Sequence, residues 1–436
     1  MIYLLLFSSY SFDWSLIQTI NHPYNSTYGN SVSYCSKKNI VFVGAPDYKT
    51  NGAVFIYQYD GRSQQWEEKQ IITPLGIYNG HFGETLASSD DCNRLFVGAP
   101  ETALYSGEKH GVVIFYQYSN GKFEKNQILQ APFTIESDFL GRHISISPSG
   151  NRIAVSLSEK VYFPQSDSRP GSVLIYDFST IWRESSVLNI SFSTKNSYFG
   201  FDTKFSDEKT LFVTVTSNAL DQMPSRVYHL DEDNKWIIAD YLPIPVSSST
   251  ITWTSLRVSK PMDRNDRVGV IGFDSDHKRG TIFLYNNNGN GWKYDSKIEH
   301  SSVTSFYEFN YIDENTIIIP DKSNNDKGKN VGALYIYKKT QGVFQHIETI
   351  YPPDNTEFLT FGSSLFSSPS QSVLVVGAHS KDHSHNLSLI NPKVYVYVNK
   401  FASMPANSHK SLVVLITTLI ALIPIPIVVY IKMKNQ

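Results

Sequence analysis

The phrase IVFVGAP at residues 40–46, followed by GAVFIY at residues 52–57, is the best guide to the fold, because close copies of both phrases recur along the chain. The second phrase has seven copies, spaced 52 to 60 residues apart. They begin at Gly52, Gly111, Gly171, Ser225, Gly280, Gly332 and Pro392. A repeat of this length in a strand-rich chain is typical of a propeller or a solenoid rather than of two unrelated domains.

The composition is also that of a chain built from strands. The 436 residues are 41% hydrophobic and 14% aromatic, with 27 Tyr and 26 Phe, and aromatic and β-branched residues favour strands. The formal net charge is −2, with no block of Lys and Arg outside the last few residues. Nucleic acid is therefore excluded as an expected partner, and we expect an all-β protein.

Each repeat predicts four short strands. The GAVFIY-like phrase is the third, the IVFVGAP-like run is the second, and a shorter first strand begins near a Phe-Gly pair, as in HFGETLASS at residues 81–89. The fourth has an aromatic residue with an aliphatic residue six positions later, as in Trp66 and Ile72, and the even spacing places both on one inward face. Seven such units predict a seven-bladed β-propeller; the alternative, a pair of β-sandwiches, fits the regular period poorly.

The seventh unit lacks a fourth strand, because PKVYVYVNKF at residues 392–401 leads directly toward the C-terminus. Near the N-terminus, FDWSLIQTIN at residues 12–21 carries Trp14 and Ile20 with the same spacing of six. We therefore predict that residues 12–21 form the outer strand of the last blade. This strand would close a propeller of residues 12–400 and cover an otherwise open sheet edge.

Both ends of the chain indicate export and a membrane anchor. The segment at residues 411–431 has no charged residue, and at about 1.5 Å per residue it matches a hydrocarbon layer of roughly 30 Å. We predict a transmembrane helix there, after a stalk at 401–410 and before a cytoplasmic tail at 432–436. A glycolipid-anchor signal is the alternative, which the basic residues of that tail disfavour. Residues 1–11 are expected to be a short secretion signal.

Three sequons, at Asn25, Asn189 and Asn386, predict N-glycosylation. We expect a type I single-pass protein of the plasma membrane with an extracellular propeller, and a lumenal propeller in a secretory-pathway membrane is the alternative. Cys35 and Cys92 allow at most one disulfide. Two semi-buried thiols in turns are favoured over that bridge.

The phrases VFVGAP at residues 41–46 and LFVGAP at residues 95–100, with Phe-Gly pairs and G-[AV]-V-x-x-Y, resemble FG-GAP repeats. These repeats form the blades of the propeller in integrin α-subunit heads and in related extracellular proteins. The resemblance covers roughly residues 12–400 and implies a role in adhesion or extracellular recognition.

Many members of that family bind calcium through a DxDxDG-like loop in the turn between the first two strands. The corresponding turns here lack that set of ligands, and their best remnant is Asp263, Asn265 and Asp266. We interpret this remnant as a solvated turn, and we expect no bound metal and no cofactor.

A second candidate cluster, in AHSKDHSH, is interpreted as an exposed polar loop rather than a metal site; it contains His379, Asp382, His383 and His385. The sequence has no P-loop, dinucleotide fingerprint, GxSxG elbow or HExxH. We therefore predict a protein that is not an enzyme. A propeller enzyme that processes glycans stays as an alternative. Its catalytic acid and base would come from different blades, so they cannot be paired from the sequence.

The long connections are the expected recognition surface. They run from the second to the third strand and from the fourth strand to the next unit, so strand alternation places them all on one face, the long-loop face. Within it Tyr105, Tyr162, Phe163 and Arg169 are of the types enriched in binding hot spots. Packing of these aromatic side chains against the propeller is an equally weighted alternative.

We expect the long-loop face to bind an extracellular protein or glycan ligand. A cargo receptor or scaffold of the secretory pathway is the other alternative. The five residues of the tail at 432–436 are too few for signalling, so cytoplasmic coupling would need a partner subunit embedded in the membrane.

Overall fold

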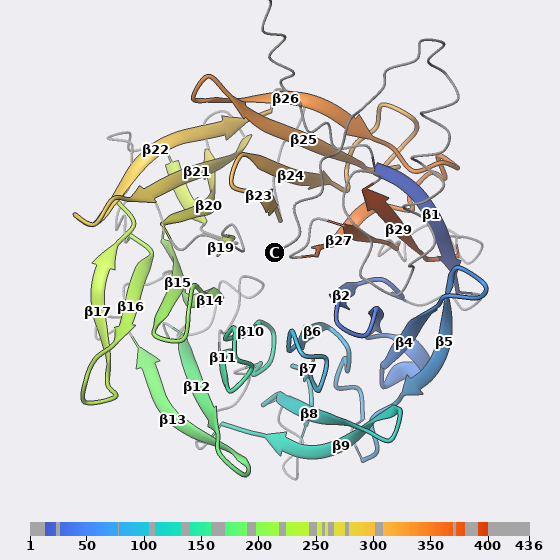
Figure 1. Cartoon of the computed structure of the whole chain (residues 1–436), viewed down its shortest axis with the longest axis horizontal. Helices are drawn as coiled ribbons and strands as arrows, with labels where there is room; N and C mark the ends of the chain where they lie inside the picture. The colour runs from blue at the N-terminus through green and yellow to red at the C-terminus, as the bar shows by residue number, and fades with distance from the viewer. Residues whose placement is uncertain are drawn as a thin grey trace, which may run out of the picture.

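The computed structural model describes a ring of seven antiparallel blades, which is a β-propeller (Figure 1). The residues it describes are 14–22, 27–76, 78–103, 110–131, 139–157, 171–189, 198–217, 224–243, 251–254, 258–259, 266–274, 279–300, 308–368, 372–379 and 391–399. Among them no helix is long and apolar enough to cross a membrane, and the predicted span at 411–431 lies outside them.

In blades 1 to 3 the strands run from the centre of the ring outward in chain order (Figure 1). These blades contain β2 (Ser31–Cys35), β3 (Ile40–Ala45), β4 (Ala53–Asp60) and β5 (Gln65–Ile72); β6 (Thr85–Ser88), β7 (Arg94–Ala99), β8 (Val112–Ser119) and β9 (Lys122–Leu129); and β10 (Ile144–Ile146), β11 (Arg152–Leu157), β12 (Ser172–Phe178) and β13 (Trp182–Asn189). A short 3-10 turn, η1 (Tyr48–Thr50), lies in the β3–β4 connection.

Blades 4 to 7 follow the same plan with one irregularity. They contain β14 (Tyr198–Phe205), β15 (Thr210–Ser217), β16 (Arg226–Leu230) and β17 (Trp236–Tyr241); β18 (Ile251–Thr254), β19 (Val258–Ser259), β20 (Arg267–Asp274), β21 (Arg279–Asn287) and β22 (Trp292–Glu299); β23 (Asn310–Asp313), β24 (Thr316–Asp321), β25 (Ala333–Thr340) and β26 (Val343–Ile350); and β27 (Phe361–Ser367), β28 (Val373–Ala378), β29 (Lys393–Asn399) and β1 (Trp14–Asn21). The inner strand of blade 5 is split into β18 and β19, and β18 also pairs with β15 of blade 4.

The ring is closed by β1, which pairs antiparallel with β29 as the outermost strand of blade 7. The register runs from Trp14 opposite Asn399 to Asn21 opposite Lys393. Trp14 is 8% exposed and packs in the apolar cluster between blades 6 and 7. The strand that the spacing of Trp14 and Ile20 predicts thus joins the two ends of the propeller without a covalent bond.

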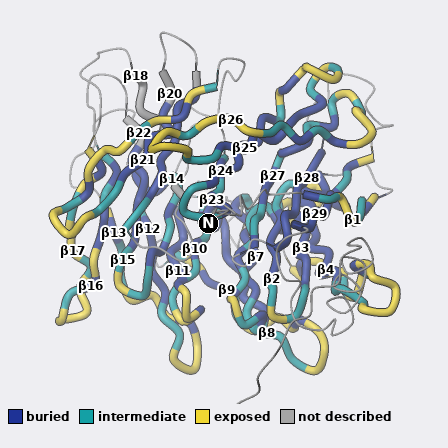
Figure 2. Tube along the Cα trace, turned by 45° about the horizontal axis from the view of Figure 1, so that its top comes forward, coloured by how far each residue is buried: buried dark blue, intermediate teal, exposed yellow. Residues whose placement is uncertain are grey.

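The core of the described part of the chain consists of seven apolar clusters, each between two neighbouring blades. One of them joins Phe42 and Ile56 of blade 1 to Leu95 and Ile114 of blade 2. Figure 2 shows that the inner strands are mostly buried, with exposed residues at the hairpin tips and along outer strands such as β22 and β26. Each blade is therefore stabilised by burial on both of its faces.

The fourth strands differ from the expectation in one respect. Trp66 and Ile72 are both buried, but Trp66 packs toward blade 7 whereas Ile72 packs toward blade 2. The pairing of β4 with β5 shifts its register between Ile56 and Tyr57. A bulge of one residue moves the following side chains to the other face, so the prediction of one inward face was wrong. The same shift recurs in the outer pair of every blade.

The Phe-Gly and Gly-Ala-Pro phrases meet where two blades touch. A Cβ atom on Gly44 of blade 1 would overlap the carbonyl oxygen of Gly83 in blade 2. Gly377 makes the same close approach to Gly29, between blades 7 and 1. Tyr28 and Gly29 are therefore the blade 1 copy of the Phe-Gly pair, which the sequence comparison missed because tyrosine replaces phenylalanine.

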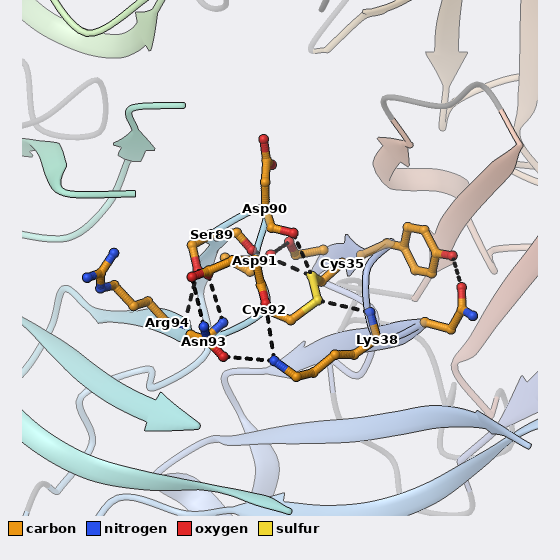
Figure 3. Close-up of a disulfide and its surroundings, with 12 residues drawn as sticks. Cys35, Lys38, Ser89, Asp90, Asp91, Cys92, Asn93 and Arg94 are labelled. Carbon is orange, nitrogen blue, oxygen red and sulfur yellow. Dashed lines mark hydrogen bonds between the residues drawn. A yellow bond between two sulfur atoms is a disulfide. The ribbon is translucent and has the colours of Figure 1, made fainter. Parts of the chain in front are cut away.

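A disulfide joins Cys35 in blade 1 to Cys92 in the β6–β7 turn of blade 2, with Cα atoms 5.7 Å apart (Figure 3). The favoured expectation of two thiols was wrong, because neighbouring blades bring two turns together that lie 57 residues apart. Lys38 supports the same contact by donating to the carbonyl of Asp91 at 3.1 Å and to Asn93 Oδ1 at 2.8 Å.

Candidate functional site

The connections that the structure describes follow the expected division into two faces. The turns β4–β5 and β8–β9 are short, whereas β24–β25 is a long connection between a second and a third strand. Tyr105 lies in the β7–β8 connection, and Tyr162, Phe163 and Arg169 lie in the β11–β12 connection, all outside the described residues. Whether those side chains gather at one site stays a prediction.

The glycosylation and metal predictions fall mostly outside the described residues as well. Asn189 is exposed at the end of β13, the fourth strand of blade 3. The predicted residues outside the described ranges are Asn25, Asn386, Asp263, Asn265, Asp382, His383 and His385. Asp266 is half-buried and His379 is buried. In the described ranges, no group of three or more His, Cys, Asp or Glu side chains is arranged to hold a metal ion.

Two apolar side chains stand out on the long-loop face, in the connection from β5 to β6 between blades 1 and 2. Leu75 is 80% exposed and Tyr78 is 74% exposed, the largest values among the exposed large hydrophobic residues of the described ranges. Gly76 lies between them in a left-handed conformation, with φ of 78°. We call Leu75, Gly76 and Tyr78 the apolar tip.

The segment after the apolar tip is anchored to both blades. The backbone N–H of Asn79 donates to Asn51 Oδ1 at 3.2 Å, and the backbone N–H of Phe82 donates to the carbonyl of the same Asn51 at 3.2 Å. On the blade 2 side, the backbone N–H of Glu101 donates to the carbonyl of Gly80 at 3.2 Å. These bonds hold the base of the apolar tip across the seam between the blades.

Close to the apolar tip in the chain, His81 lies among three carboxylates, a set that we call the His81 cluster. Its Nδ1 is 3.4 Å from Glu84 Oε2 and 3.6 Å from Glu101 Oε1, and its Nε2 is 3.8 Å from Asp47 Oδ1. The hydrogen bond to Glu84 raises the pKa of His81, with the charges of Glu101 and Asp47 adding to the effect and burial opposing it. The four side chains are partly exposed.

A second group of charges lies on the inner strands and turns near the axis of the ring. Burial lowers the pKa of Lys204 on β14, and the carboxylates of Asp202, Asp90 and Glu308 oppose that shift. His143 Nδ1 lies 3.8 Å from Asp202 Oδ1. This group joins blades 2, 3, 4 and 6 electrostatically, and it shares no residue with the apolar tip or the His81 cluster.

Sequence reasoning did not find the apolar tip or the His81 cluster. The predicted hot-spot residues all lie in connections between a second and a third strand, whereas Leu75 and Tyr78 belong to the connection from β5 to β6. The signal that could have found them is the apolar stretch LGIY at residues 75–78 before a Phe-Gly pair. His81, Glu84 and Glu101 are close in the chain, but Asp47 joins them only because blades 1 and 2 are neighbours.

The fold defines the class of seven-bladed β-propeller proteins. The solved WD40 repeats of RRP9 align with a TM-score of 0.56 and 11% identity over 89% of this chain and 98% of that one. A protein assigned provisionally as a 6-phosphogluconolactonase of Bacteroides uniformis aligns with a TM-score of 0.51 and 10% identity over 74% of this chain and 85% of that one.

Likenesses at this level of identity establish the propeller fold alone and transfer no activity to this chain. The sequence matches no protein-family model and no curated protein. The resemblance to FG-GAP repeats therefore rests on the sequence motifs alone.

Proposed function

We propose that this protein is an extracellular recognition module that binds a protein ligand through the apolar tip on its long-loop face. The observation that carries this proposal is the exposure of Leu75 and Tyr78 together in one anchored connection. Monomeric proteins rarely leave large apolar side chains grouped in water, and aromatic anchors dominate many protein interfaces. The presence of an aliphatic side chain beside the aromatic one in the same connection of the chain favours a protein surface over a glycan.

Three observations support an extracellular location for the propeller. Disulfides persist in oxidising compartments, and Cys35 and Cys92 are bonded and buried. Asn189 is exposed, as an N-glycosylated side chain must be. The apolar segment at 411–431 supplies the proposed membrane anchor. The proposed location is the plasma membrane, with the propeller outside.

The proposed family is that of FG-GAP propellers. Its support is the close approach of Gly44 to Gly83, which joins a Gly-Ala-Pro phrase to the Phe-Gly pair of the next blade. The isolated bridge between Gly52 and Phe82 adds a backbone contact at the same seam. Adhesion is the role that this family membership favours.

The test is binding of the purified full-length protein to arrays of extracellular proteins and glycans. We expect Leu75→Ser with Tyr78→Ser to weaken binding at least about tenfold, because hot-spot side chains contribute about 2 kcal/mol or more. Val343→Ser is the matched control, since Val343 is 61% exposed but follows a tight turn on the other face. Equal binding by the double variant, at unchanged melting temperature, contradicts the proposal. Binding to glycans alone contradicts the choice of a protein ligand.

A further inference from the structure

We infer that His81 is a pH switch: its protonated form fixes the apolar tip across the seam of blades 1 and 2, and its neutral form loosens it. The inference rests on the proposed function only for its biological meaning, because it supplies the regulation of the same site. The switch itself is a property of the loops and can be measured without a ligand.

The geometry places His81 where three segments meet. Asp47 comes from the β3–β4 connection, Glu84 from the entry to β6, and Glu101 from the β7–β8 connection. Among the described residues, these are the titratable groups that face the imidazole from the segments packed around it. A protonated imidazole attracts all three carboxylates, whereas a neutral one does not. Protonation therefore binds the three segments together, and deprotonation removes that attraction.

The backbone conformation of Asn79 and His81 depends on contacts with the neighbouring segments. His81 and Asn79 are not glycines, yet they have φ values of 53° and 50°. Such left-handed residues persist where surrounding contacts hold them. The holding contacts include the bonds of the Phe82 and Glu101 N–H groups to Asn51 and Gly80. Loss of the His81 ion pairs removes one support of this conformation, so we expect these bonds to open more often.

Two other blades contain the same backbone turn without a titratable side chain at that position. The residue before the Phe-Gly-like pair is Phe139 in blade 3, with φ of 49°, and Thr360 in blade 7, with φ of 51°. The next N–H groups also donate to carbonyls of the preceding blade, Leu140 to His110 at 3.1 Å and Phe361 to Val331 at 2.9 Å. These two amides are internal controls for the amide of Phe82.

The direction of the effect follows from the raised pKa of His81. A group whose pKa is higher in the closed state stabilises that state fully below the pKa of the open state. This contribution is lost as the pH rises through the pKa of the closed state. The apolar tip is therefore fixed below about pH 6.5, the ordinary histidine value, and loosened above the raised one.

The experiment is residue-resolved hydrogen exchange of the full-length protein from pH 5.5 to pH 8.5, corrected for intrinsic exchange. We expect the protection of the Phe82 and Glu101 amides to fall with rising pH, by about tenfold for each pH unit by which the pKa of His81 is raised. The amides of Leu140 and Phe361 should keep constant protection. In His81→Gln, the amides of Phe82 and Glu101 should lose their pH dependence.

Parallel behaviour of the Phe82 and Leu140 amides in the parent protein overturns the switch, and this result needs no variant to fold. Persistence of the pH dependence in His81→Gln overturns the assignment to His81. Leu75→Ser with Tyr78→Ser should leave the exchange pattern unchanged while weakening ligand binding. A failed proposed function and a failed switch therefore give different results.

Discussion

The side-chain amide of Gln18 on β1 makes two hydrogen bonds to the backbone of Trp66 on β5, across the boundary between blades 7 and 1. Gln18 Oε1 accepts from the Trp66 N–H at 2.7 Å, and Gln18 Nε2 donates to the Trp66 carbonyl at 3.0 Å. Gln70 makes the same pair of bonds to Phe123, and Gln127 makes it to Trp182. The same pair of hydrogen bonds therefore joins β1 to blade 1, blade 1 to blade 2, and blade 2 to blade 3.

Removing the buried anchor of this strand should destabilise the whole ring. Trp14→Ala should cost about 3–5 kcal/mol of unfolding free energy, as large-to-small core changes do. Leu16→Ala is the control, because Leu16 lies on the same strand but is 36% exposed. Chemical denaturation measures both variants. A Trp14→Ala variant as stable as the control would show that β1 contributes little to closure.

Adding a side chain at a motif glycine should also destabilise the propeller, although less than removing a large core side chain. Gly44→Ala places a methyl group against the carbonyl of Gly83, and overpacking of this kind costs about 1–3 kcal/mol. Gly61→Ala is the matched control, since a Cβ atom there meets nothing within 4 Å. Thermal unfolding of the two variants compares them. Equal melting temperatures would refute the role assigned to the Gly-Ala-Pro phrase.

Loss of the disulfide should weaken the seam between blades 1 and 2. Cys35→Ser with Cys92→Ser should lower the unfolding free energy by about 2–4 kcal/mol, the range typical of native disulfides. Mass spectrometry of the unreduced parent protein should find the Cys35–Cys92 peptide. Alkylation of both cysteines in the unfolded, unreduced protein would show that the bridge is absent.

A buried carboxyl group in blade 6 should make stability depend on pH. Asp321 is 6% exposed, and burial raises its pKa to about 6. The folded state therefore holds the proton more tightly than the unfolded state, whose aspartate titrates near about 3.9. From this group, stability should fall as the pH rises from about 4 to about 6. Asp321→Asn should remove that dependence in unfolding curves measured across this range; an unchanged slope would contradict the assignment.

Strand order and closure could be predicted because they depend on patterns that repeat along the chain. Trp14 and Ile20 have the spacing of the other fourth strands, and the last unit lacks such a strand. The sequence therefore predicts that the N-terminal segment completes the last blade. The register of β1 with β29, in which Trp14 lies opposite Asn399, agrees with that prediction. The two faces of Trp66 and Ile72 could not be predicted, because a bulge leaves no mark in the spacing of apolar residues.

The contacts between blades were harder to predict than the blades themselves. Gln18 looks like an ordinary polar residue of an outer strand, and its role appears only when the N–H and carbonyl of Trp66 lie opposite it. The pairing of Cys35 with Cys92 likewise depends on the neighbouring positions of two turns. His81 gains one of its carboxylates in the same way, because Asp47 belongs to the preceding blade.

Site-specific photo-crosslinking on intact cells can show directly whether the apolar tip is the recognition surface. A benzophenone side chain would replace Tyr78 in one version of the full-length protein and Arg62 in the other. Arg62 is exposed in the tight β4–β5 turn of blade 1, on the face of the propeller opposite the long-loop face. We expect one saturable crosslinked protein partner from position 78 and none from position 62. The same partner from position 62 with none from position 78 would contradict it.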